Sequence, residues 1–319
     1  MVGLGIPQVT ISDIEDARQR IRGIAWRTPL VPASRYDDGK IYLKLECVQR
    51  TGSFKIRGAW NKMSRCTQDE LRKGFVTISA GNHGQAVAWC AERLESACTV
   101  YVPEAAVERK VKSIETMGAK IVKRPVREIM DSMSDDRMYN LGMTFVHPFA
   151  DPYVIAGQGT VGLEVLEDLE EVKTVLVPVG GGGLVNGIAI ALKAKKAGVE
   201  VYGVQAEGAA PLPLFFETGK AEDIGEIRTI ADGIATTKVF PYMAELFRRN
   251  LTGALTVNDE EIKLAMTHIL NESHAVAEPA GASSLAAAVK YRTRLKEPIV
   301  CVVSGGNGDP ELLSQLIKT

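Results

Sequence analysis

The sequence predicts an α/β protein with two lobes, each built around an open and mostly parallel sheet. The chain has 319 residues, which exceeds one ordinary domain and suits two. Short apolar segments alternate with helical segments along it, as in sheets covered by helices on both faces. Three predicted strands end in glycine-rich turns, at 79–84, 179–184 and 304–309. Ligands bind at the carboxyl ends of such strands, so we expect one crevice between the lobes.

The composition is that of an ordinary globular protein, with 45% hydrophobic and 24% charged residues. The net charge of −1 provides no field that attracts nucleic acid or anionic lipid, so neither is an expected partner. Five scattered cysteines indicate a reducing compartment and no disulfide framework. The N-terminus lacks the features of a signal peptide, and the apolar runs are too short for a membrane span. We therefore expect a cytoplasmic protein.

The first half of the chain opens with a predicted helix over 13–24, for which Ser12 and Glu15 indicate a capping box. A proline-punctuated connection follows over 28–36. Further helices are expected at 53–73, 85–94, 105–117 and 159–169. Apolar runs predict strands at 41–48, 74–79, 97–103, 119–124 and 144–149.

The second half repeats this alternation. Its strands are expected at 173–179, 199–207 and 298–304. Its helices are expected at 184–197, 259–273, 281–291 and 310–318. Residues 208–240 are rich in proline and glycine and predict mostly irregular structure. Two sets of strands in one chain indicate two α/β lobes.

The tetraglycine Gly180–Gly183 lies between a predicted strand and a predicted helix. Four residues without a Cβ let backbone N–H groups converge on an oxyanion, and the helix dipole favours a phosphate there. A Walker A loop requires a following Gly-Lys-Ser/Thr, and the dinucleotide fingerprint requires G-x-G-x-x-G; neither is present. The loop therefore predicts a site for a single phosphate group.

A lone phosphate site together with an available amine suggests pyridoxal phosphate. This cofactor requires a lysine for the Schiff base, an anion site and a partner for its ring nitrogen. Lys55 supplies the first, the glycine loop the second and Ser304 the third. A serine hydroxyl leaves the ring nitrogen mostly neutral, which suits reactions that pass the electrons directly to a leaving group. Asp309 and Glu278 are rival ring partners.

Several polar residues also have a simpler interpretation. Ser79 and Asn82 precede an apolar helix, where Ser and Asn commonly cap the first turn. His83 suits a structural or a functional role, and His147 is expected to be structural. Glu278, followed by proline, is also typical of an ordinary helix start.

Seven motifs occur in order between residues 51 and 309: TGSFKIRGA, SAGNHGQA, VIAGQGT, VPVGGGGL, ADG, EPAGA and SGGNGD. Together they resemble the threonine/serine dehydratases and serine racemases, which are pyridoxal phosphate enzymes of fold type II, the tryptophan synthase β-like fold. Each motif alone is weak, but seven in order at family-like spacing are specific. The resemblance covers nearly the whole chain and implies a cofactor bound in the cleft between the lobes.

The resemblance also implies roles for individual residues. Lys55 resembles the Schiff-base lysine, with Phe54 beside the cofactor ring. Asn82 resembles the asparagine at the cofactor's 3-oxygen, and Ser304 the ring-nitrogen partner. The residues that resemble the phosphate loop are Gly180, Gly181, Gly182, Gly183 and Leu184. The turn expected to bind the substrate carboxylate comprises Ser79, Ala80, Gly81, Asn82 and His83.

The family fold implies a small lobe, 50–145, inserted into a large lobe formed by 1–49 and 146–319. We expect a homo-oligomer, a dimer or a tetramer. The C-terminal regulatory domain of biosynthetic threonine dehydratases is absent from this sequence, so isoleucine feedback through it is not expected.

Some family members hold a divalent cation with a glutamate and an aspartate in the loop after VQAE. Glu207 is present here, but Pro211 and Pro213 stand where further ligands are expected. A hard cation requires several oxygen ligands, and the four histidines show no zinc-site spacing. We therefore expect no metal.

The resemblance implies β-elimination of water from a hydroxy amino acid, L-threonine or L-serine, giving a 2-oxo acid and ammonia. A serine racemase and a 3-hydroxyaspartate dehydratase are the alternatives, and a catalytically silent ligand-binding protein is a third. Racemases of this family carry a serine in a turn reading SSGNH, whose hydroxyl serves the second face of the substrate. Here that position is Ala80, which favours elimination. The presence of Lys55 and of the whole glycine loop argues against a catalytically silent ligand-binding protein.

Overall fold

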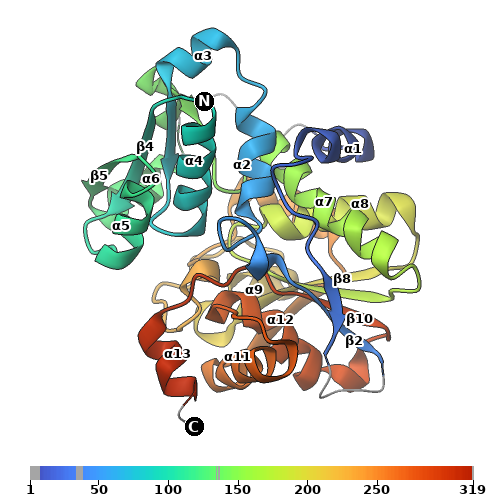
Figure 1. Cartoon of the computed structure of the whole chain (residues 1–319). Helices are drawn as coiled ribbons and strands as arrows, with labels where there is room; N and C mark the ends of the chain where they lie inside the picture. Colours follow the sequence, from blue (N-terminus) through green and yellow to red (C-terminus); the bar gives the residue numbers. More distant parts are fainter. Residues whose placement is uncertain (1–7, 34–38, 134, 136, 318–319) are drawn as a thin grey trace.

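The computed structural model describes residues 8–33, 39–133, 135 and 137–317, which form two lobes (Figure 1). The large lobe carries a six-stranded sheet in the order β1-β2-β10-β7-β8-β9, and the small lobe a four-stranded sheet in the order β5-β4-β3-β6. All neighbouring strands pair in parallel except β1 and β2. The expected fold class, α/β with open and mostly parallel sheets, is confirmed.

The strands are short, and all except β1 and β9 lie within the segments that the apolar runs predicted. In the large lobe they are β1 Leu30–Pro32, β2 Ile41–Lys44, β7 Thr174–Pro178, β8 Glu200–Ala206, β9 Gly253–Val257 and β10 Ile299–Val302. In the small lobe they are β3 Phe75–Ile78, β4 Cys98–Pro103, β5 Lys120–Arg124 and β6 Thr144–Phe145.

Helices cover both faces of the large sheet (Figure 1). Val175 and Val177 of β7 face one core, and Leu176 between them faces the other, because successive side chains of a strand point to opposite faces. The helices of the first core are α1 Ile11–Arg20, α7 Pro152–Asp168, α8 Gly183–Lys195, α9 Pro211–Thr218 and α10 Pro241–Asn250. Those of the second are α11 Asp259–Ser273, α12 Pro279–Lys290 and α13 Pro310–Ile317.

The small sheet is covered in the same way. One face packs against α2 Lys55–Met63, α3 Gln68–Lys73, α4 Asn82–Arg93 and α5 Glu108–Glu115, and the other against α6 Val126–Ser132. No helix in the described part of the chain is both long enough and apolar enough to cross a membrane.

The N-terminal region differs from the prediction in two places. Thr10, not Ser12, caps α1: its hydroxyl accepts the N–H of Asp13, and the Asp13 carboxylate accepts the N–H of Thr10. The segment predicted as a connection contains β1, which pairs with β2 at the edge of the sheet. An edge strand tolerates proline, because one side of its backbone has no partner strand.

Other differences come from helix starts that the sequence reading missed. The stretch 53–73 is two helices, because the capping box of Thr67 and Glu70 begins α3 anew. The segment predicted as irregular contains α9, and α10 follows it; each begins with a proline in its first turn, where no N–H is required. Helix α6 and strand β9 were also not predicted.

A buried ionic cluster joins the lobes behind the cleft. The Arg57 guanidinium on α2 is fully buried and binds two carboxylates, with Nη2 2.7 Å from Glu46 Oε1 and Nη1 2.6 Å from Glu164 Oε1. The buried Lys44 ammonium lies 2.7 Å from Glu164 Oε2. Because α2 begins at Lys55, the cluster holds the helix that presents this lysine.

Helices α2 and α7 also touch backbone to backbone. A Cβ added at Gly157 of α7 would lie 2.6 Å from the carbonyl oxygen of Arg57, and one at Gly58 would overlap the side-chain amide of Gln158. Glycine at both positions therefore permits the close crossing that positions α2 over the large lobe.

Candidate active site

Two adjoining cavities lie between the lobes. The outer cavity, of about 540 Å³, is lined by Lys55, the turn Ser79–His83, Phe149 and the first two glycines of the loop after β7. The inner cavity, of about 50 Å³, is lined by Phe54, Lys55, Gln158, Gly180–Gly183, Leu184, Glu278 and Ser304. Residues from three distant glycine-rich turns thus converge at the carboxyl ends of β3, β7 and β10, as the strand pattern predicted.

Lys55 begins α2 and reaches both cavities. Its Nζ donates a hydrogen bond of 2.9 Å to the carbonyl oxygen of Pro148 and lies 5.1 Å from the centre of the Phe54 ring. Burial lowers the pKa of the Lys55 amine to about 8, although the Glu278 carboxylate raises it. The amine is therefore available in its neutral, nucleophilic form near physiological pH.

The glycine loop connects β7 to α8, whose first residue is Gly183. Gly182 has a φ of +94°, and a Cβ there would overlap the ring of Phe247. A Cβ at Gly181 would overlap the ring of Phe149. The first turn of a helix leaves N–H groups without intrahelical acceptors, so this loop and the start of α8 present an anion-binding backbone.

Two of the three candidate ring partners lie in the inner cavity. Ser304 and Glu278 are both buried there. Asp309 is exposed, and its carboxylate accepts the N–H of Glu311 at the start of α13. The structure thus places Asp309 outside the cavities and leaves Ser304 and Glu278 within them.

Asn82 does not cap α4, contrary to the simpler interpretation. The N-cap of α4 is Gly81, and the Asn82 side chain instead spans the cleft. Its Nδ2 donates to Glu278 Oε1 over 2.7 Å, and its Oδ1 accepts from Asn307 Nδ2 over 2.8 Å. Burial raises the pKa of the Glu278 carboxyl to about 7, although the hydrogen bond from Asn82 lowers it.

The turn before α4 presents its start to the outer cavity. The Ser79 hydroxyl accepts the N–H of Gly81 and makes no cap to α4. His83 is buried, and its Nε2 donates to the carbonyl oxygen of Val146 over 3.0 Å. Burial, and to a smaller extent the Lys55 ammonium, hold the pKa of the His83 imidazole well below its ordinary value. His83 is therefore neutral at physiological pH.

His147 has a structural role, as expected. Its Nδ1 accepts the N–H groups of Phe149 and Ala150, and its Nε2 faces the carbonyl oxygen of Met133. It therefore shapes the loop whose Phe149 ring packs against the glycine loop.

The sequence reading missed three residues at this site: Gln158, Asn307 and Asp232. All three stand inside quoted motifs, where a polar residue among apolar or glycine neighbours could have signalled them. Asp232 lines the outer cavity. Its ion pair with Lys110 across the cleft is revealed only by the tertiary structure.

Glu207 is already paired with a cation. The Lys290 ammonium lies 2.8 Å from Glu207 Oε1 and 2.9 Å from Glu261 Oε2. Across the described ranges, no group of three or more His, Cys, Asp or Glu side chains is arranged to hold a metal ion.

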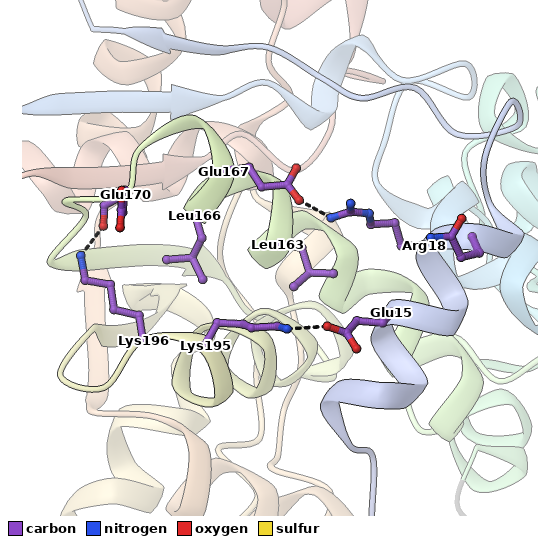
Figure 2. A pocket seen from close by; sticks show the side chains of 9 residues that line it. Glu15, Arg18, Leu163, Leu166, Glu167, Glu170, Lys195 and Lys196 are labelled. Carbon is purple, nitrogen blue, oxygen red and sulfur yellow. Dashed lines mark hydrogen bonds and ion pairs between the residues drawn. The ribbon is translucent and has the colours of Figure 1, made fainter.

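A further groove of about 800 Å³ lies on the surface between α1, α7 and α8 (Figure 2). Its charged side chains pair within the groove. The pairs are Lys195 with Glu15, Arg18 with Glu167, and Lys196 with the main-chain carbonyl of Glu170. Its charges thus compensate one another, and we assign no site to it.

Comparison with known proteins gives consistent matches over nearly the whole chain. The chain is 38% identical over 316 residues to an L-threonine ammonia-lyase of Thermotoga maritima, covering 97% of this chain and 78% of that protein. It is 37% identical to the catabolic L-threonine dehydratase TdcB of Staphylococcus aureus, covering 97% of this chain and 92% of that protein.

Solved structures agree with these matches. A serine racemase from Dictyostelium discoideum superposes with a TM-score of 0.85 at 34% identity, covering 94% of this chain and 99% of that one. A serine racemase from maize superposes with a TM-score of 0.88 at 31% identity, covering 97% of each chain. A threonine deaminase from Solanum lycopersicum superposes with a TM-score of 0.84 at 30% identity, covering 96% of this chain and 93% of that one.

The model of the family "Pyridoxal-phosphate dependent enzyme" matches residues 21–305. The chain therefore belongs to the pyridoxal-phosphate dependent enzymes, with the fold type II architecture.

Proposed function

We propose that this enzyme eliminates water from L-threonine, and from L-serine as a second substrate, giving 2-oxobutanoate or pyruvate together with ammonia. The β-elimination predicted from the sequence agrees with the names of the curated relatives, which are threonine ammonia-lyases and dehydratases. The observation that carries the proposal is a buried amine of lowered pKa, Lys55, between an anion-binding glycine loop and an apolar cavity.

The residues of the inner cavity fit pyridoxal phosphate. The glycine loop lines the inner cavity and packs so closely against the Phe149 and Phe247 rings that a Cβ at Gly181 or Gly182 would overlap them, and the start of α8 favours a dianion there. We assign Asn82 to the 3-oxygen and Ser304 to the ring nitrogen. When bound, the cofactor withdraws electrons from the α-carbon of the substrate.

Lys55 then acts as the base of the reaction. With the cofactor in place, its neutral amine would be the group that removes the proton from the α-carbon. The β-hydroxyl would take up a proton and leave as water, and hydrolysis of the enamine product would release the 2-oxo acid and ammonia. Near neutral pH the lowered pKa keeps a substantial fraction of the amine able to accept a proton.

The turn Ser79–His83 suits the substrate carboxylate. It stands at the N-terminus of α4, where backbone N–H groups and the helix dipole favour an anion. Neutral His83 adds no positive charge, so backbone groups of Ala80, Gly81 and Asn82 supply the main attraction.

An apolar part of the outer cavity favours an uncharged side chain. Val126, Ile129 and Met133 line it, and they suit the methyl group of threonine. The second carboxylate of 3-hydroxyaspartate needs a free cation, but the Lys110 ammonium in this cavity is paired with Asp232. Threonine is therefore the better fit.

The same geometry disfavours racemisation. A racemase needs an acid on the face opposite Lys55, and Ala80 has no proton to give. The Ser79 hydroxyl is held in its own turn by the N–H of Gly81.

The test is a panel of amino acids given to the purified enzyme, with 2-oxo acid release and chirality both measured. L-Threonine should give the highest rate and L-serine a lower one. Faster release from 3-hydroxyaspartate, or D-serine formed as fast as pyruvate, would contradict the proposal. Absence of cofactor absorbance and of any turnover would favour a silent binding protein.

We also propose the lobe boundaries expected from the resemblance, with 50–145 as the inserted small lobe, and a homo-oligomeric state. Light scattering coupled to size-exclusion chromatography distinguishes a monomer from a dimer or a tetramer.

A further inference from the structure

Gln158 is a buried amide without a partner. It lies on α7 and is 1% exposed. Neither its Nε2 nor its Oε1 has a hydrogen-bond partner among the residues that the structure describes. Buried amides in native proteins are almost always satisfied, so this side chain indicates a group that is bound in the functional protein.

The position of Gln158 identifies the space that such a group occupies. Gln158 lines the inner cavity together with Gly180–Gly183 and Lys55. Its Nε2 lies against Gly58 at the crossing of α2 and α7, where glycine offers no side chain as a partner. A half-turn of the amide about its last bond exchanges Nε2 and Oε1, so the N–H donors can face the inner cavity, which Gln158 lines.

The chemistry of the inner cavity identifies the kind of partner. Backbone N–H groups of the glycine loop and the N-terminus of α8 all favour an anion. A glutamine amide carries two N–H donors in addition to its carbonyl acceptor. Donors from the glycine loop and from a side chain of α7 that lines the same cavity match the oxygens of one phosphate group.

We propose that Gln158 donates a hydrogen bond from its side-chain amide to the phosphate of pyridoxal phosphate, beside the backbone donors of Gly180–Gly183. This assignment rests on the phosphate site assigned above to the glycine loop. It makes Gln158 a cofactor-binding residue that recognises the phosphate and not the ring.

The test compares two ligands that differ only in the phosphate. The apoenzyme is titrated with pyridoxal phosphate and with pyridoxal, and both dissociation constants are measured for the parent and for Gln158→Met, which has a similar volume. We expect the variant to bind pyridoxal phosphate roughly ten- to hundredfold more weakly and pyridoxal as tightly as the parent does. Gln158→Glu should weaken binding of the phosphate form still further, because it brings a carboxyl group to a dianion.

A stability measurement separates this role from a structural one. Replacing an unpaired buried amide by an apolar group is neutral or stabilising in the apoenzyme, so the apo Tm of Gln158→Met should equal or exceed that of the parent. The matched control is Gln49→Met, since Gln49 is also buried but bonded to both backbone groups of Trp26. The control should lower the apo Tm and leave the preference for the phosphate form unchanged.

Each outcome bears on the proposal. Equal weakening of both ligands, or no weakening of either, in Gln158→Met would overturn it. If Gln158→Met does not fold, Gln158→Asn, which shortens the side chain and keeps its polarity, must show the same selective loss. If the parent itself binds pyridoxal as tightly as the phosphate form, the glycine loop is not the phosphate site, and the earlier assignment fails instead.

Discussion

Asn82 of the small lobe donates a hydrogen bond of 2.7 Å to the Glu278 carboxylate of the large lobe. The two residues are 196 positions apart in the chain, and their contact links the turn that lines the outer cavity to a residue of the inner one. Because the carboxylate is buried, the bond also couples the lobes to the protonation state of Glu278.

Glu278→Gln should change how the stability of the apoenzyme depends on pH. The pKa of Glu278 is raised by burial to about 7 in the folded protein, from 4.5 in the unfolded chain. The stability that it contributes is therefore full below pH 4.5 and is lost as the pH rises toward 7, by roughly 3 kcal/mol. Thermal unfolding from pH 5 to 8 should show a smaller decline for Glu278→Gln, while exposed Glu226→Gln keeps the parent's slope. Identical slopes in all three proteins would refute this role.

Lys55→Ala should abolish both turnover and the visible absorbance that marks the covalently held cofactor, with the fold retained. Turnover is measured by release of 2-oxo acid, covalent attachment of the cofactor by an absorbance spectrum, and the fold by circular dichroism. In the parent apoenzyme, the rate of covalent attachment should increase as the pH rises through about 8, because the neutral amine is the nucleophile. Exposed Lys73→Ala serves as the control; normal activity in Lys55→Ala would remove this residue from the mechanism.

Gly182→Ala should cost at least about 2 kcal/mol of stability and most of the cofactor affinity. The φ of +94° and the adjacent Phe247 ring leave no place for a methyl group. Gly180→Ala is the matched control, since a Cβ there meets its nearest neighbour, the Gly233 carbonyl oxygen, at 3.4 Å. Urea unfolding and cofactor titration should separate the two variants, and equal behaviour would argue against the strained cradle.

Arg57→Met should destabilise the protein by about 3–5 kcal/mol, because it leaves the buried carboxylates of Glu46 and Glu164 without their partner. Arg228→Met, which removes an exposed pair with Glu226, should change the free energy of unfolding by less than about 0.5 kcal/mol. Denaturant titration of both variants measures the difference. A small loss in Arg57→Met would mean that the cluster does not hold α2.

Ala80→Ser should raise the rate of serine racemisation, because it places a hydroxyl in the turn that faces the substrate. Chiral chromatography of serine after incubation, compared with pyruvate release, gives the ratio of the two reactions. Ala105→Ser, elsewhere in the outer cavity, is the control for a generally more polar wall. An unchanged ratio of racemisation to elimination in Ala80→Ser would show that this position does not decide between the two reactions.

Local patterns in the sequence predicted the architecture well. Apolar runs such as 173–179 and 298–304 marked the central strands, because a strand buried on both faces must be apolar throughout. Local rules failed where two signals compete within a few residues. Thr10 and Ser12 are both acceptable caps, and each has an acidic residue three positions later, Asp13 and Glu15, so the local pattern does not decide between them. Pro211 suggested irregular structure, although a proline in the first turn is compatible with a helix.

The site was predictable in its parts and not in its connections. Lys55, Ser304 and the glycine loop stand at strand and helix ends that the sequence reveals. The partner of Asn82 is distant in sequence, so nothing local distinguishes a bridge across the cleft from a helix cap. The pairing of Lys110 with Asp232 was hidden for the same reason. Gln158 was the detectable omission, since a glutamine among the apolar residues of α7 requires a polar partner.

The crossing at Gly58 and Gly157 has a consequence for protein engineering. The lysine of the site belongs to a small-lobe helix by sequence, yet the backbone of that helix rests directly on the large lobe. Chimeras that exchange small lobes between relatives should therefore inherit both glycines as one unit. In a library that varies Gly58 or Gly157 alone, most variants should therefore have Lys55 out of position, even where their other substitutions are favourable.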